Sequence, residues 1–158
     1  ARMGGGALHA RGAGNARAAF RQNRGPGYGK GDDIIVTQLV YGVNSDAEFK
    51  AYWHTLINPA NTDDLEYDGN KLIATDENGN TYTLAPIYDV VNGRSVNSSA
   101  SPVEWEFFST DLSETSSGSR GTNVLYADAH VQYQPYPGSF PATRTVAELS
   151  HKYMELNS

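Results

Sequence analysis

The chain has 158 residues, a formal net charge of −6 and no cysteine. This length suits one domain of ordinary size and argues against two. The absence of cysteine excludes disulfides, thiolate nucleophiles and cysteine zinc sites. Tyr, Gly, Asn and Ser are plentiful, whereas Leu, Ile, Val and Phe are scarce. That composition favours a β-rich, loop-rich fold over a helical bundle.

Charge is divided unevenly along the chain. Residues 1–31 contain six basic groups and no acidic group, a net +6, whereas residues 32–158 contain six basic and eighteen acidic groups, a net −12. A basic arm on an acidic body can bind nucleic acid, or it can dock on the acidic body of an identical subunit. The sequence therefore divides into a basic Gly/Arg-rich N-terminal assembly arm, 1–31, and a globular head, 32–158.

Apolar runs are short throughout the sequence. None approaches the roughly 18 to 20 residues that a membrane-spanning helix needs, so no membrane span is expected in the given chain. No signal-peptide core precedes the head. The chain begins at Ala1 without an initiator Met, which is typical of a processed or truncated product.

The arm contains nine glycines and too little apolar surface to fold alone. Only Ala13–Asn23 has passable helix propensity, and a helix that short is marginal without packing. We therefore expect an extended or partly helical arm that is ordered by contacts outside the domain. The next segment, Asp33–Val43, predicts a strand buried on both faces, because its apolar residues do not alternate cleanly. Within it, Ile34–Val40 is expected to be an exposed strand that joins subunits by strand addition.

Ser45-Asp46-Ala47-Glu48 has the form of a capping box, with Ser45 as the N-cap and Glu48 reaching back to it. The apolar residues that follow have helical spacing, and Asn58-Pro59 ends the pattern. This spacing predicts an amphipathic helix that buries Phe49, Tyr52, Trp53, Leu56 and Ile57.

Short strands separated by turns follow from Leu65. LEY, KLIAT and TYTLAPI are joined by Asp68-Gly69 and Asn78-Gly79, which predicts a three-stranded meander. Asn92-Gly93 marks another turn. VEWEFF, Val103–Phe108, predicts a strand that alternates Val103, Trp105 and Phe107 against two glutamates.

A polar loop leads to a hairpin of two short strands, Asn123–Ala127 and Val131–Tyr133, joined by Asp128-Ala129-His130. The last expected element is a terminal helix over Thr145–Leu156 with Val146, Leu149, Tyr153 and Leu156 facing inward.

The segment Ser101–Tyr133 holds VEWEFF, a polar loop and NVLYADAHVQY. It resembles the prepilin-type proteins of planctomycetes and related bacteria that end in the His-X9-Asp-Gly motif, which are similar to type IV pilins and pseudopilins. Asp128 and His130 stand where that family has its Asp and the following His. Gly118 replaces the first His of the motif, and Ala129 replaces its Gly. The Gly/Arg arm replaces the family's apolar N-terminal helix.

The resemblance implies a pilin-like α+β head, with an antiparallel β-sheet and one amphipathic helix, on the bacterial cell surface or outside the cell. Pseudopilin heads often bind calcium. Loop carboxylates such as Asp63 with Asp64, or Asp111 with Glu114, are therefore open candidates for a calcium site.

Three acidic patterns have a chemical and a structural interpretation. Asp128 and His130 could contribute to a metal or base site, but the sequence favours a turn-forming Asp with a hydrogen-bonded His. Asp76-x-Asn78-x-Asn80 mimics a calcium loop, but the positions that need Gly and Glu hold Thr81 and Ile87, which favours a hairpin turn. Glu104 and Glu106 fit a glycosidase pair superficially, and fit an ordinary solvated strand face better. No nucleophile elbow, phosphate loop or dinucleotide fingerprint is present.

We therefore expect a non-enzymatic structural subunit of an extracellular homopolymer, assembled through the arm and through contacts between heads. The alternative is a nucleic-acid-binding or viral coat-type protein that uses the same arm. The arm residues expected at the interface are Arg2, Arg11, Arg17, Phe20, Arg21, Arg24, Tyr28 and Lys30.

Overall fold

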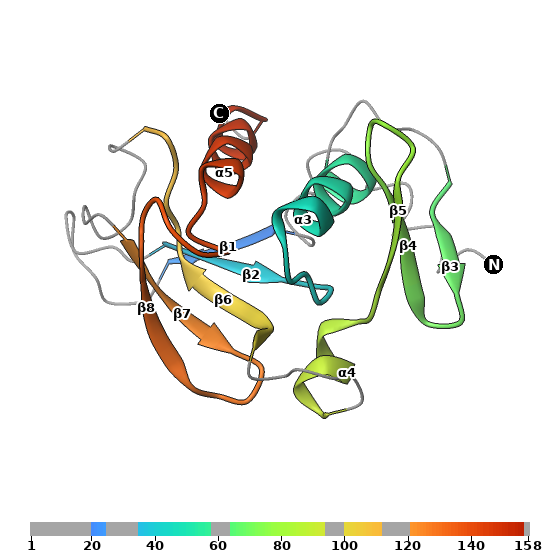
Figure 1. Cartoon of the computed structure of the whole chain (residues 1–158), viewed down its shortest axis with the longest axis horizontal. Helices are drawn as coiled ribbons and strands as arrows, with labels where there is room; N and C mark the ends of the chain where they lie inside the picture. Colours follow the sequence, from blue (N-terminus) through green and yellow to red (C-terminus); the bar gives the residue numbers. More distant parts are fainter. Residues whose placement is uncertain (1–19, 25–34, 58–63, 94–99, 112–120, 157–158) are drawn as a thin grey trace.

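The computed structural model describes residues 20–24, 35–57, 64–93, 100–111 and 121–156. Its main sheet is antiparallel and has five strands in the order β1-β2-β6-β7-β8. These strands are β1 (Phe20–Arg24), β2 (Ile35–Leu39), β6 (Pro102–Glu106), β7 (Gly121–Tyr126) and β8 (Val131–Pro135). Helices cover one face of this sheet (Figure 1).

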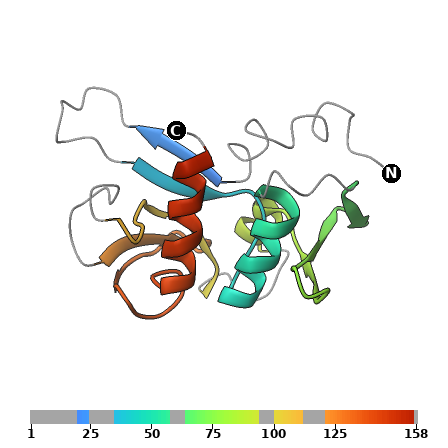
Figure 2. The ribbon, with the colours of Figure 1, turned by 90° about the horizontal axis from the view of Figure 1, so that it is seen from above.

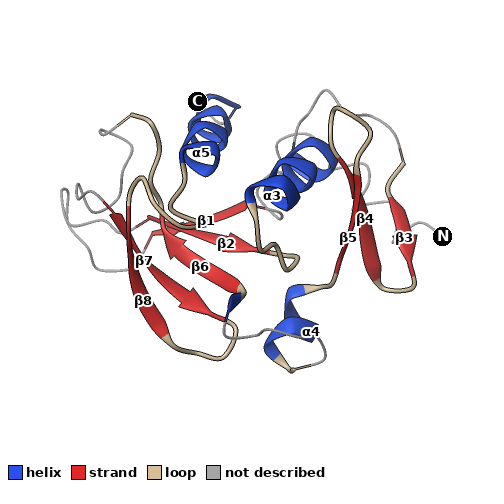
Figure 3. Cartoon of the chain, in the orientation of Figure 1, coloured by secondary structure: helices blue, strands red, loops and turns tan. Residues whose placement is uncertain are grey.

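A second, smaller sheet contains β3 (Glu66–Asp68), β4 (Lys71–Thr75) and β5 (Thr81–Leu84). The strands are antiparallel neighbours, and the turn glycines Gly69 and Gly79 have φ angles of 64° and 87°. Tight hairpin turns need such positive angles, so the predicted meander is confirmed. The sequence did not predict that it would form a sheet separate from the main one, which Figure 3 shows on the other side of the first helix.

The first helix, α3 (Asp46–Tyr52), continues without a break into the π-helical segment η1 (Trp53–Ile57). Ser45 Oγ accepts a hydrogen bond from Glu48 N, as the capping box predicts. Glu48 Oε1, however, accepts from the backbone N–H of Asn44 at 2.8 Å, one residue before the N-cap. The five apolar residues predicted to face inward are all buried.

The terminal helix α5 (Arg144–Leu156) lies beside α3 (Figure 2). Val146 and Tyr153 are buried and Leu149 is half-buried, as predicted, whereas the side chain of Leu156 is outside the described part. A third helix, α4 (Ile87–Val91), was not predicted and begins at the last residue of the segment that was expected to be strand. Pro86 precedes it as its N-cap, a position where the missing N–H of proline costs nothing.

The core lies between α3, α5 and the inner face of the main sheet. Phe49 of α3 packs on Trp105 of β6, with ring centroids 6.3 Å apart, and Phe140 contacts both rings at 6.2 and 6.5 Å. Burial of each such ring contributes about 1.5–3 kcal/mol. These aromatic contacts fix α3 on the sheet, while its opposite side contacts β4 and β5.

Two expectations about the first strands are wrong. β2 covers only Ile35–Leu39, and its residues alternate: Thr37 and Leu39 are buried, whereas Val36 and Gln38 are half-buried. It is also not an open edge, because β1 pairs with it on one side and β6 on the other. The predicted strand addition at Ile34–Val40 is therefore blocked by the chain's own arm.

The arm was expected to be extended or partly helical, and the part of it that the structure describes is extended. Phe20–Arg24 forms strand β1, paired along its whole length with β2. A strand gains an inter-strand partner for its main-chain groups here, and this outweighs a helix propensity that is only marginal.

Overall, mixed helices and antiparallel sheets make the fold α+β, as predicted, but with more than one helix. No helix within the described ranges is both long enough and apolar enough to span a bilayer.

Candidate functional site

The bend between β7 and β8 is a tight turn organised by Asp128. The backbone N–H of Ala129 donates to Tyr126 O, and Tyr126 N–H donates to His130 O, both at 2.9 Å. Asp128 Oδ1 accepts from the backbone N–H of His130 at 3.1 Å and contacts its Nδ1 at 2.5 Å. Because a carboxylate only accepts, Nδ1 is the donor in that contact.

These contacts also set the electrostatics of the turn. The backbone N–H of His130, and then its ring, hold the pKa of Asp128 below its usual range. The imidazole stacks on the Tyr126 ring, with centroids 4.5 Å apart and planes at 2°. Asp128 and His130 thus bind each other and the turn, an arrangement suited to holding the two strands together.

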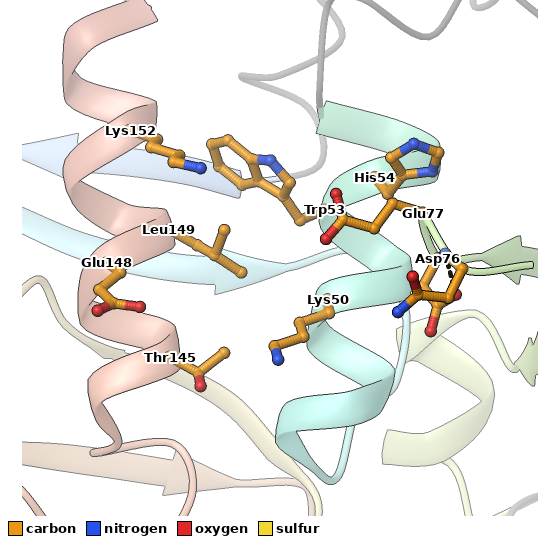
Figure 4. Close-up of a pocket in the computed structure, with 10 residues that line it drawn as sticks. Lys50, Trp53, His54, Asp76, Glu77, Thr145, Glu148, Leu149 and Lys152 are labelled. Atoms are coloured by element: carbon orange, nitrogen blue, oxygen red, sulfur yellow. Dashed lines mark hydrogen bonds between the residues drawn. The ribbon is translucent and has the colours of Figure 1, made fainter. Parts of the chain in front are cut away.

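A groove of about 320 Å³ lies between α3, α5 and the turn that joins β4 to β5 (Figure 4). Lys50, Trp53 and His54 line it from α3 and η1, and Asp76 and Glu77 from the turn. The contributions of α5 are Thr145, Glu148, Leu149 and Lys152. In Figure 4, Leu149 and Lys152 point from α5 towards Trp53.

Hydrogen bonds to Thr75 fix one wall of the groove. His54 Nδ1 lies 2.9 Å from Thr75 O, and because a carbonyl oxygen only accepts, Nδ1 is the donor in this hydrogen bond. The hydroxyl of Thr55 donates to the same carbonyl and accepts from Thr75 N at 2.7 Å. The last turn of the first helix is therefore tied to the end of β4.

Asp76 accepts the hydrogen bonds that hold the turn between β4 and β5. Its Oδ1 accepts from the backbone N–H groups of Asn78 and Asn80, and its Oδ2 from the Asn80 side chain. Partial desolvation raises the pKa of Asp76, but the hydrogen bonds from Asn80 and Asn78 outweigh it, so the pKa is lowered. Both carboxylate oxygens thus serve the hairpin turn, as the structural interpretation of this segment predicts.

The groove combines two lysines, three carboxylates, one imidazole and an apolar floor of Trp53 and Leu149. Such a lining suits a segment that carries both signs of charge. Within the described part of the chain, no three His, Asp or Glu side chains are grouped closely enough to hold a metal ion.

The remaining predicted sites are scattered. Phe20, Arg21 and Arg24 lie on β1 at one edge of the main sheet. The other arm candidates, Arg2, Arg11, Arg17, Tyr28 and Lys30, lie outside the described residues, as do Asp63 and Glu114 of the calcium candidates. Asp64 and Asp111 are exposed and lie in different parts of the chain.

Glu104 and Glu106 lie on the outer face of β6 and are half-buried. Glu106 Oε1 accepts from both the backbone N–H and the side-chain amide of Asn123, at 3.0 and 3.1 Å. This carboxylate therefore joins β6 to β7.

Sequence reasoning missed the groove between the helices. Its two sides are about a hundred residues apart in the chain, so no local pattern joins them. The one available signal was that Lys50, Trp53 and His54 share helical spacing.

Comparisons with known proteins add no family. The sequence matches no protein-family model, and no curated protein or solved structure matches it.

Proposed function

We propose that this protein is a structural subunit of an extracellular filament or pilus-like homopolymer, in which the basic arm of one copy contacts the acidic head of the next. The observation that carries the proposal is the segregation of charge, +6 in residues 1–31 against −12 in the rest. Opposite charges on separate parts of one chain attract copies of that chain to each other.

The position of β1 supports the same proposal. This strand belongs to the arm and brings Arg21 and Arg24 to an outer edge of the main sheet. A contact between an arm and a head uses two different surfaces, so it does not close on itself and generates an open chain of subunits. The resemblance of Ser101–Tyr133 to prepilin-type proteins is a separate reason to propose a polymer and a location outside the cytoplasm.

The experiment is sedimentation velocity of the full chain at low and high salt. Salt shortens the screening length from roughly 30 Å at 0.01 M to roughly 3 Å at 1 M. We expect large species at low salt that dissociate at high salt, and a loss of those species in the double variant Arg21→Glu/Arg24→Glu.

The matched control is Lys71→Glu/Arg144→Glu, which changes the net charge equally on exposed residues of the head. It should leave the low-salt species in place. If both double variants lose them equally, net charge and not the arm governs association, and the proposal fails.

A second candidate function rests on the same arm, since six basic groups without an acid also suit phosphate binding. In that case the large species should contain nucleic acid, absorb strongly at 260 nm and disappear after nuclease treatment.

A further inference from the structure

Strand β8 is the outer strand of the main sheet, opposite the edge formed by β1 (Figure 3). No strand in the described part of the chain pairs with its free side. Its sequence, VQYQP, holds no charged residue, and Val131 and Tyr133 are 64% and 50% exposed. Charged side chains are one common protection of edge strands against pairing, and β8 has none, although Pro135 limits pairing at its end.

Both exposed apolar side chains lie on one face of the sheet. Val131 stands opposite Leu125 of β7, and Tyr133 stands opposite Asn123. The Tyr133 ring lies over Gly121, where an added Cβ would be 2.5 Å from its Cζ. The ring therefore lies against the backbone of Gly121 on one side, which restricts its rotamers and lowers the entropy cost of binding.

The hydrogen-bond pattern tells which main-chain groups of β8 face outward. Tyr126 N–H donates to His130 O, and antiparallel pairs alternate between bonded and non-bonded. Gln132 and Gln134 therefore face β7, while Val131 and Tyr133 direct their N–H and C=O groups to the free side. Pro135 has no N–H to offer, so the complete run is Val131–Tyr133, centred on Gln132.

We propose that this edge pairs with the β8 strand of a second copy, antiparallel, with Gln132 opposite Gln132 of the second copy. This register lets Val131 of each copy exchange two hydrogen bonds with Tyr133 of the other, and it also brings their side chains together. Each such cross-strand pair contributes about 0.2–1 kcal/mol.

The register described above makes β8 complementary to itself, and charge makes β8 the edge at which two copies meet. The heads carry a net −12, so two of them meet at least cost where neither presents charge. The opposite edge, β1, carries Arg21 and Arg24, and like charges would face each other if two such edges paired. Asp128, the nearest acid along the chain, precedes β8 and falls outside the paired residues.

This pairing is short and buries less area than the roughly 1,200–2,000 Å² of a stable interface. It therefore acts together with the contact between arm and head, and its place in a polymer rests on the proposed function. A two-fold β8 contact joins heads in pairs, and the arms join the pairs to one another.

The test uses the absence of cysteine from the chain. In the proposed register residue 132 faces itself in a non-bonded pair, with Cα atoms about 4.5 Å apart, within the range that a disulfide spans. The full-length variant Gln132→Cys should form a disulfide dimer under mild oxidation. Its cross-linked fraction should exceed that of the exposed control Asn78→Cys at least about tenfold, because pairing raises the local thiol concentration.

A second variant separates pairing from chance collision. Tyr133→Lys added to Gln132→Cys puts a charge on the edge and should return cross-linking to the control level, with an unchanged circular dichroism spectrum. Equal cross-linking of Gln132→Cys and Asn78→Cys would overturn the proposal. A preference for a mixed disulfide with Gln22→Cys would also overturn it, since β8 would then pair with β1.

The outcome is distinguishable from that of the proposed function. If filaments form but Gln132→Cys forms no disulfide, the proposed polymer stands and the proposed β8 contact is refuted. If the disulfide forms but no filaments do, the β8 contact stands and the proposed polymer is refuted.

Discussion

Ala129 is the residue of the hairpin turn where one substitution tests the geometry most sharply. Its φ angle is 76°, and it is the one described residue other than glycine with a positive φ. This conformation costs an L-residue about 1–2 kcal/mol, whereas glycine adopts it freely. Ala129 is exposed, so removal of its methyl group sacrifices no packing.

The expected effect of Ala129→Gly is therefore an increase in stability. Glycine loses more conformational entropy than alanine on folding, which lowers the free energy of unfolding by about 0.5–1 kcal/mol. The net gain is about 0.5–1 kcal/mol, and for a chain of this size it raises Tm by about 1–4 °C. Thermal unfolding followed by circular dichroism measures the shift.

The same substitution at Ala127 is the matched control. Ala127 is buried, and its φ is not positive. Ala127→Gly should lower stability by about 1 kcal/mol, because it adds entropy to the unfolded chain and removes a buried methyl group. If Ala129→Gly were no more stable than the parent while Ala127→Gly behaved as expected, the left-handed turn would be refuted.

Three further predictions follow from buried or hydrogen-bonded groups. Thr37 is fully buried, and its Oγ1 has no hydrogen-bond partner within the described part of the chain. Thr37→Val should therefore raise the free energy of unfolding by about 1–2 kcal/mol, which urea denaturation measures as a higher midpoint. Tyr52 Oη accepts from Val40 N–H at 3.1 Å, so Tyr52→Phe should cost about 1 kcal/mol in the same assay, and an unchanged midpoint would argue against that bond. The pKa values of Asp128 and Asp76 are lowered in the folded state, so both residues stabilise the fold above the pKa of the unfolded chain and lose that effect as pH falls below about 4. Asp128→Ala should accordingly lower stability at pH 7 and flatten its decline between pH 5 and 2; an undiminished decline would assign the acid sensitivity to other carboxylates.

The sequence predicted those elements whose signals are local. Ser45 and the spacing of Phe49 to Ile57 predicted a helix here, though not the π-helical form of η1, and Asp68-Gly69 and Asn78-Gly79 predicted the turns of the meander. Each of these patterns reflects neighbours within a few residues, where capping and turn geometry act directly on the backbone.

What the sequence could not predict depends on distant segments. β2 pairs with β6, which lies more than sixty residues later, and no local sequence pattern in either strand indicates its partner. Pairing with β2 converts Phe20–Arg24 from a marginal helix former into a strand, a tertiary effect that overrides local propensity. The groove between α3 and α5 and the position of β8 at the edge of the main sheet arise only once these pairings are set.

The proposed polymer forms through the basic arm. Its direct test is electron microscopy of the full chain at low salt, with and without nuclease and beside a variant that lacks residues 1–31. We expect filaments that survive nuclease and are absent from the truncated variant. Single particles in every sample, or assemblies that nuclease dissolves, would contradict it.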